Sequence, residues 1–203
     1  MPAAEGLTEA EIVEAALRVI RQSGVEALSM RRLSRELGRS HMAMYYHVAD
    51  KDALLELVAA AAMRDITVPD PASGPWDARL RALITGIDDQ LRANPGIGEL
   101  LLDRMLSTDR RLLNAAMDIL VDAGFEDDEV LMAYATVHTY LFGRLQVASS
   151  PQTTREMNAH DTVARVVTRL PALTGRDFFE FGVDTLIAGL RERLQGAAPH
   201  RST

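Results

Sequence analysis

The sequence contains no cysteine among its 203 residues. This absence excludes disulfides, thiolate metal sites and cysteine nucleophiles, and it fits the reducing cytoplasm, where we expect the protein to act. A long apolar run is also lacking, because the longest, around Leu57–Met63, is much shorter than the about 20 residues that cross a bilayer. Residues 1–8 carry no basic stretch followed by an apolar one, so we expect neither a secretory signal nor a membrane partner.

Positive charge is scarce overall, since 22 Lys and Arg stand against 29 Asp and Glu, for a net charge of -7. Such a balance is unfavourable for binding nucleic acid, because Lys and Arg must neutralise the phosphates. Between Leu28 and Lys51, however, five basic residues stand against two acidic ones. This distribution predicts one small surface that faces DNA, on a body that otherwise repels it.

Apolar residues recur with the helical period, and no segment alternates in the period of a strand between turn signals. The sequence therefore predicts an all-α fold. Thr8 and Glu11 form a capping box that starts the first helix, and Gly24 ends that helix. Further capping residues predict the starts of a second, a third and a fourth helix, at Ser29, Ser40 and Asp50.

A boundary is predicted at Val68–Pro75, which holds three prolines and a glycine and cannot continue a helix. Helical periodicity resumes at Trp76. We expect helices at 76–93, 97–106, 110–123, 127–148 and 156–170, and a last one from about Thr174 to Gly196. The predicted division is a helix-turn-helix domain at 1–50, a connecting helix and linker at 51–75, a helical ligand-binding and dimerisation domain at 76–196, and a tail at 197–203.

The segment Ser29–His47 has the layout of a helix-turn-helix, with Gly38 in the turn between two short helices. In this motif the second helix enters the major groove with its N-terminal end toward the bases. The side chains expected to face outward are Arg39, Ser40, His41, Ala43, Tyr45 and Tyr46. Their hydroxyl, imidazole and methyl groups suit phosphates and base edges. Because neighbours on a helix point about 100° apart, we expect one of the two tyrosines to lie partly in the core.

Two stretches resemble the TetR family of regulators: Leu-Ser-Met-Arg-Arg-Leu-Ser-Arg-Glu-Leu-Gly at 28–38 and Tyr-Tyr-His-Val-Ala-Asp-Lys-Asp-Ala-Leu-Leu at 45–55. The resemblance covers about the first 60 residues strongly and the remainder only through the number and order of its helices. It implies a dimeric helical regulator that binds DNA through its N-terminal helices and a small molecule through the rest. Without it, two short helices around a turn are also compatible with a bundle that does not bind DNA.

The resemblance also assigns DNA contacts. It implies that Arg31 meets a base or a phosphate, and that His41, Met42 and Ala43 meet base edges. The residues implied to hold the DNA backbone are Tyr45, Tyr46, His47 and Lys51. Ser29, Arg39 and Ser40 complete the candidate DNA-binding set. Arg39 and Met42 depart from the family's common pattern, which bears on the operator sequence rather than on DNA binding.

Candidate ligand contacts lie in the C-terminal part, where Tyr134, His138 and Phe142 recur every four residues on one helical face. Arg104, Met105 and Met117 are candidates to line the same cavity, since methionine adapts to ligand shape. Simple core packing is the alternative for all six. We expect no metal site and no cofactor, because His138 and His160 have no partner at a standard ligand spacing.

These predictions combine into a homodimeric repressor that binds a pseudo-palindromic operator and is released by a small-molecule inducer. The predicted dimer packs the helix at 127–148 and the last helix against their symmetry mates as a four-helix bundle. Its candidate interface residues are Phe179, Val183, Leu186, Ile187 and Leu190. The alternatives are a helical ligand carrier or enzyme that has lost DNA binding, with Asp103, Arg104 and His138 as its polar groups, and an activator or DNA-organising protein. No acid-base, nucleophile or metal-ligand pattern favours catalysis.

Overall fold

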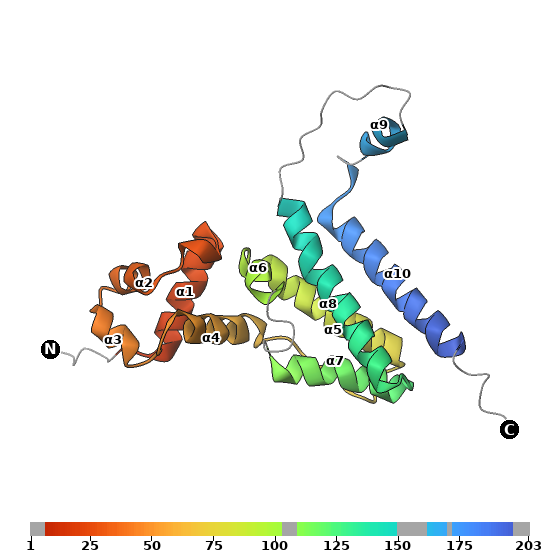
Figure 1. Cartoon of the computed structure of the whole chain (residues 1–203), viewed down its shortest axis with the longest axis horizontal. Coiled ribbons are helices and arrows are strands. Elements are labelled where there is room, and N and C mark those ends of the chain that lie inside the picture. The colour runs from red at the N-terminus through yellow and green to blue at the C-terminus, as the bar shows by residue number, and fades with distance from the viewer. Residues whose placement is uncertain (1–6, 103–108, 150–161, 170–171, 197–203) are drawn as a thin grey trace.

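The computed structural model describes residues 7–102, 109–149, 162–169 and 172–196, and every regular element in these ranges is a helix (Figure 1). The all-α prediction is confirmed. The first part contains α1 (Glu9–Ser23), the short 3-10 helix η1 (Val25–Ala27), α2 (Met30–Glu36), α3 (His41–Tyr45) and α4 (Lys51–Met63). The second part contains α5 (Trp76–Ala93), α6 (Ile97–Leu102), α7 (Arg110–Ala123), α8 (Asp127–Ser149), α9 (Thr162–Val167) and α10 (Gly175–Gly196).

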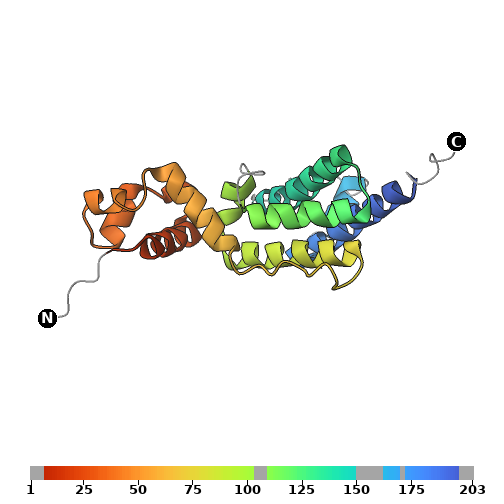
Figure 2. The same cartoon turned by 90° about the horizontal axis from the view of Figure 1, so that it is seen from below.

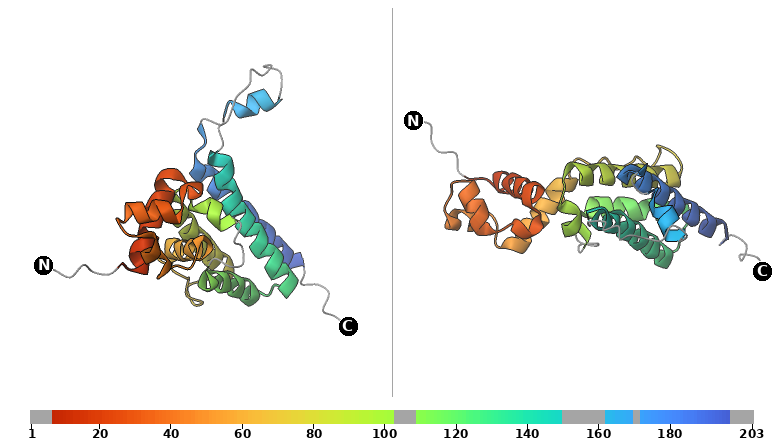
Figure 3. Two further views of the ribbon diagram at one scale, coloured as in Figure 1. Left: turned by 60° about the vertical axis from the view of Figure 1, so that its left-hand side comes forward. Right: turned by 90° about the horizontal axis from the view of Figure 1, so that it is seen from above.

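The molecule is elongated, with α1 to α3 at one end and α5, α7, α8 and α10 at the other (Figures 1 and 2). We call residues 7–50 the N-terminal bundle and α5 to α8 with α10 the C-terminal body. Helix α4 leads from one to the other and contacts α1, α5 and α6. Figure 3 shows α9 standing apart from the C-terminal body.

The first helix forms where its sequence predicts. The backbone N–H of Thr8 donates to the Glu11 carboxylate at 2.8 Å, and the Glu11 N–H donates back to the Thr8 hydroxyl at 3.2 Å. Gly24 ends the helix with φ at +78°, a conformation that favours glycine. A buried apolar stripe that includes Ile12 and Val19 packs α1 against α4. The short helix η1 directly after Gly24 was not predicted.

The N-terminal bundle meets the C-terminal body at the end of α1. Arg21 donates to the side-chain oxygen of Asn94 at 3.2 Å. Gly96 lies so close to Ile20 that a Cβ there would approach the Ile20 carbonyl oxygen to 3.1 Å. A side chain at position 96 would therefore push the two parts away from each other, beside the point where α4 crosses between them.

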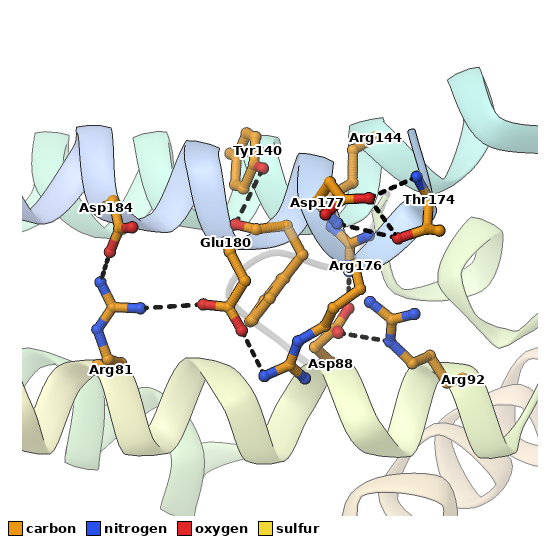
Figure 4. A network of polar contacts seen from close by, with 11 residues as sticks. Arg81, Asp88, Arg92, Tyr140, Arg144, Thr174, Arg176, Asp177, Glu180 and Asp184 are labelled. Atoms are coloured by element: carbon orange, nitrogen blue, oxygen red, sulfur yellow. Dashed lines mark hydrogen bonds and ion pairs between the residues drawn. The ribbon is translucent and has the colours of Figure 1, made fainter. Parts of the chain in front are cut away.

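Ion pairs join helix α10 to α5 along the C-terminal body (Figure 4). Arg81 of α5 pairs with Glu180, at 3.4 Å, and with Asp184 of α10. Further along, Arg191 of α10 pairs with Asp77 of α5. These contacts connect residues about a hundred positions apart in the sequence, so they fix tertiary structure rather than individual helices.

A charged cluster also lies inside the C-terminal body. Asp88 of α5 is 0% exposed and pairs with Arg144 of α8 and, at 2.7 Å, with Arg92 one turn along its own helix (Figure 4). The Arg144 guanidinium also lies 5.1 Å from the centre of the Phe179 ring. Burial lowers the pKa of Arg144. The counter-charge of Asp88 therefore offsets the cost of placing a cation there.

Most of the predicted helix bounds are confirmed to within a residue or two, including 76–93, 110–123 and 127–148. The predicted helix at 97–106 is described only as far as Leu102, and of the one predicted at 156–170 the structure describes Thr162–Val167 as helix. The remaining predicted positions at these two places are outside the described residues or are turn.

Candidate DNA-reading surface and ligand cavity

Helices α2 and α3 form a compact helix-turn-helix. The Ser29 hydroxyl accepts the Arg32 N–H at 3.2 Å, and the Ser40 hydroxyl accepts the Ala43 N–H at 3.2 Å, so each short helix has a side-chain cap. Gly38 turns the chain between them with φ at +61°. Leu33 and Met44 are fully buried and anchor the two helices. Apolar packing thus holds α3 on the bundle and leaves its opposite face open.

The predicted DNA-contacting residues lie on α2 with its N-cap, on α3, in the segments that flank α3, and at the start of α4. All of them are exposed except Ala43, which is partly buried: Ser29, Arg31, Arg39, Ser40, His41, Met42, Tyr45, Tyr46, His47 and Lys51. Arg32 has a different place, because its guanidinium donates to the Ser23 hydroxyl at 3.0 Å and ties α2 to α1. The basic segment therefore combines an arginine that holds the bundle together with others that face solvent.

The expectation that one of Tyr45 and Tyr46 lies partly in the core is wrong. Tyr45 is 46% exposed and Tyr46 is 84% exposed, because Met44 is the residue of this short helix that faces the core. The imidazole of His41 stacks on the Tyr45 ring, with the ring centres 5.2 Å apart. Met42, 68% exposed, presents an apolar side chain at the start of α3. Aromatic, imidazole and thioether groups are thus all available on one short helix.

The start of α4 adds a cationic point beside α3. Asp50 caps this helix by accepting the Ala53 N–H at 2.8 Å, and Lys51 is exposed at the first helical position. A phosphate placed here would meet the Lys51 ammonium together with the positive end of the helix dipole.

On α1, hydrogen bonds from Thr8 and, to a lesser degree, the charge of Arg39 lower the pKa of Glu11.

An apolar cavity of about 70 Å³ lies inside the C-terminal body. Its walls come from the end of α4, from α5 and α6, from α7 with its N-cap and from α8: Met63, Leu80, Leu83, Ile84, Ile87, Leu101, Asp109, Leu112, Leu113, Ala116, Leu120, Tyr134, Val137, His138, Leu141 and Phe142. Among these described residues the ionisable side chains are Asp109, Tyr134 and His138. The cavity is smaller than the roughly 300–1,000 Å³ typical of ligand pockets.

His138 is the central polar group of the cavity wall. It is 7% exposed, and its ring centre lies 4.5 Å from that of Phe142 and 6.0 Å from that of Tyr134. Burial lowers the pKa of His138, although a hydrogen bond to the Leu101 backbone partly opposes this. Burial likewise raises the pKa of Tyr134. Both side chains are therefore uncharged at neutral pH and act as hydrogen-bonding groups in an apolar setting.

The predicted ligand-contacting residues divide into three groups. Tyr134, His138 and Phe142 line the cavity together. Met117 does not line it, because on α7 the cavity is faced by Leu112, Leu113, Ala116 and Leu120. Arg104 and Met105 lie outside the described residues. Sequence reasoning missed Met63 and Asp109 as wall residues, and the apolar period of α5 signalled burial without distinguishing a cavity wall from solid core.

A second hollow, of about 520 Å³, runs along the outside of α8 and α10. It is lined by Phe125, Glu129, Met132, Ala133, Ala135, Thr136, Val137, Thr185, Leu186, Gly189, Leu190 and Arg193. Of the predicted interface residues, Leu186 and Leu190 lie in this groove and are partly buried. Phe179, Val183 and Ile187 are buried within the single chain, because they form the stripe of α10 that faces the core. Assigning these three to a dimer surface is therefore a mistake.

The described ranges hold neither a metal-ion cluster nor a membrane-spanning helix. No group of three or more His, Asp or Glu side chains there is placed to hold a metal ion. No helix in the described part of the chain is long and apolar enough to span a membrane. The DNA-facing surface, the cavity and the groove are therefore the features on which a function can be built.

Comparison with known families places both parts of the chain. The description "Bacterial regulatory proteins, tetR family" matches residues 12–58, and "Tetracyclin repressor-like, C-terminal domain" matches residues 68–194. An "HTH-type transcriptional regulator" from Saccharopolyspora erythraea is 27% identical over 199 residues, spanning 91% of this chain and 84% of the relative. The tetracycline repressor protein class C of Escherichia coli is 24% identical over 204 residues, spanning 89% of each chain.

Solved structures agree with the sequence comparisons. Apo ActR from Streptomyces coelicolor superposes with a TM-score of 0.82 at 25% identity, and covers 97% of this chain and 100% of its own. ActR in complex with actinorhodin superposes with a TM-score of 0.76 at 27% identity, over 95% of this chain and 99% of its own. The chain therefore belongs to the TetR family of bacterial helix-turn-helix transcriptional regulators.

Proposed function

We propose that the protein is a homodimeric repressor that acts in the cytoplasm, binds a pseudo-palindromic operator and is released from it by a small molecule. The observation that carries this proposal is the position of α4 between the two sites. Near its first residue lies α3, which Ser40 caps and on which His41 stacks against Tyr45, and its last residue, Met63, lines the cavity. The proposal assigns no catalytic activity. A DNA-reading surface and a ligand cavity that are joined by one helix, α4, suit a ligand-controlled regulator rather than an enzyme.

The DNA contacts follow from the chemistry of the exposed groups. Arg31 and His41 are suited to base edges or phosphates, and the Met42 side chain to the methyl group of thymine. The two tyrosine hydroxyls and Lys51 hold the phosphate backbone. These contacts need two copies of α3 in successive major grooves, since one short helix reads too few bases for a specific site.

The ligand is proposed to be a largely apolar small molecule with few hydrogen-bonding groups. The cavity offers aliphatic and aromatic walls with Asp109, Tyr134 and His138 as its polar points. ActR was solved with actinorhodin and with (S)-DNPA, which supports the binding of a small molecule in a related fold. A cavity of about 70 Å³ must widen to admit it, so ligand entry displaces the walls.

The dimer is proposed to form through the groove along α8 and α10. Leu186 and Leu190 line it, and exposed Met132 faces it from α8. Gly189 offers a direct test, because a Cβ at this position meets nothing within 4 Å in the single chain. Gly189→Arg should therefore leave the protomer folded and yield a monomer by sedimentation, whereas Ala188→Arg, outside the groove, should remain a dimer. A dimeric Gly189→Arg variant would remove this face from the proposal.

Operator reading is tested by selecting bound sequences from random DNA with the purified protein. We expect a pseudo-palindrome whose half-sites are centred about one helical turn apart, with an affinity that falls steeply as salt rises. Binding without sequence preference at moderate salt would contradict the function. A ligand screen for release of the selected duplex then tests sensing, with His138→Ala as the variant expected to lose the response and Met117→Ala, away from the cavity, as its control.

A further inference from the structure

Helix α4 ends without a local stop, and a distant side chain completes it. Arg64, rather than a glycine, follows Met63. The Arg64 N–H donates to the Ala61 carbonyl and the Ile66 N–H donates to the Met63 carbonyl, each at 3.3 Å. The last carbonyls of a helix need donors from elsewhere when no left-handed residue turns the chain back. Besides the local backbone bonds, Arg111 in the first turn of α7 supplies side-chain donors to the carbonyls at this end.

The Arg111 guanidinium spans three carbonyl groups at this end of α4. One terminal nitrogen donates to the Ile66 carbonyl at 2.5 Å, and the other donates to the Met63 and Arg64 carbonyls at 3.1 and 3.2 Å. A cation at a helix C-terminus also meets the negative end of the helix dipole. The planar fork of arginine can hold several acceptors at once, which a lysine ammonium cannot do in a fixed geometry.

The same clamp touches the ligand cavity. Asp109 caps α7 by accepting the backbone N–H of Arg111 at 2.9 Å, and its second carboxylate oxygen lies 3.5 Å from the Arg111 guanidinium. Asp109 also lines the cavity. On the other side of the clamp, the Met63 side chain lines the cavity while the Met63 carbonyl accepts from Arg111. A molecule that widens the cavity therefore pushes on both partners of the clamp.

We propose that Arg111 is the positioning residue that couples the cavity to the DNA-reading helices. With the cavity empty, the guanidinium holds the end of α4 against the first turn of α7 and so fixes the angle of the helix that carries Lys51. Displacement of Asp109 and Met63 by a ligand breaks the contacts of Arg111 with the end of α4 and lets α4 move. The inference rests on the proposed function and names the contact through which its switch acts.

A cavity-filling substitution tests the coupling without knowledge of the ligand. Ala116 lines the cavity from α7, so Ala116→Phe adds a ring that overfills it and pushes the walls apart. The measurement is the affinity for an operator duplex selected with the wild-type dimer, in a double-mutant cycle with Arg111→Ala. We expect Ala116→Phe to weaken binding roughly tenfold in the wild type and less than about twofold when Arg111 is absent.

Arg110→Ala is the matched control, because Arg110 precedes Arg111 on the same helix and is exposed. In that background Ala116→Phe should retain its full effect. Arg111→Lys keeps the charge but cannot span the three carbonyls, so it should also reduce the effect of Ala116→Phe on operator affinity. It takes the place of Arg111→Ala in the cycle if that variant fails to fold. Circular dichroism and sedimentation must show folded dimers for every protein compared.

The outcomes separate the coupling from the function beneath it. Equal losses from Ala116→Phe with and without Arg111 would overturn the coupling and leave Arg111 a structural tie. A filled cavity that leaves operator affinity unchanged in the wild type would overturn it equally. If the wild-type dimer selected no specific sequence, the proposed function itself would fail before the cycle began.

Discussion

The N-terminal bundle and the C-terminal body are both helical, yet different kinds of contact hold them. In the N-terminal bundle, Thr8, Ser29 and Ser40 each cap the helix that follows them directly in sequence. An ion pair there, Arg18 with Glu14, spans a single helical turn. In the C-terminal body, arginines pair with carboxylates on other helices, as Arg81 does with Asp184.

This difference matches what each part does. A reading head must present a short rigid helix with an open face, and local caps with an apolar core achieve that. The C-terminal body surrounds a cavity, and ion pairs such as Arg81 with Asp184 tie its helices together. The contrast predicts which substitutions should damage stability and which should damage binding.

The largest expected effect is on stability, at the buried ion pair of the C-terminal body. Asp88→Ala leaves the Arg144 guanidinium buried without its counter-charge, and removing one partner of such a pair costs about 3–5 kcal/mol of unfolding free energy. The control is Asp184→Ala, which removes an exposed pair and should cost no more than about 1 kcal/mol. Urea unfolding at one fixed protein concentration measures both. Equal losses would mean that burial does not distinguish the two pairs.

The next effect concerns binding and should leave stability unchanged. Arg31→Ala and His41→Ala each remove an exposed side chain of the N-terminal bundle, so thermal unfolding should not move. Operator affinity should fall by about 1–3 kcal/mol, a factor of roughly 5 to 150, if these groups read bases. Arg110→Ala removes the same charge from the C-terminal body and should bind the operator as the wild type does. An unchanged affinity in both variants would take them off the DNA-contacting surface.

The same contrast explains how far the sequence predicts the structure. The caps, Gly24, Gly38 and the apolar stripe of α1 are local signals, and they predicted the helices of the N-terminal bundle nearly to the residue. The pairing of Asp88 with Arg144, or of Arg111 with the end of α4, depends on chain segments that only tertiary folding brings together. The helical period of its apolar residues predicted a wide apolar face for α10, but it could not distinguish the residues that face the core, such as Phe179, from those at the surface.

A smaller effect compares two capping boxes, one in each part. Thr8 pairs with Glu11 at the start of α1, and Thr174 exchanges the same hydrogen bonds with Asp177 at the start of α10. Thr8→Ala and Thr174→Ala should each cost about 1 kcal/mol of unfolding free energy. Because the signal is local in both places, the two losses should be alike. A loss confined to one variant would show that the helix of the other variant is held in place by tertiary packing alone.

The smallest effect is a pH dependence that arises at His138, in the C-terminal body. Burial lowers the pKa of His138 below its ordinary value of 6.5, so the unfolded chain takes up a proton at a pH where the folded chain does not. Stability should therefore be independent of this group above about pH 6.5 and should fall as the pH drops below it. His138→Gln keeps a donor for the Leu101 backbone but cannot titrate, so its melting temperature should converge on that of the wild type, or exceed it, as the pH falls from 8 to 5. Parallel curves for the two proteins would mean that the imidazole meets water in the folded state, and the cavity wall would then be wetter than its apolar lining indicates.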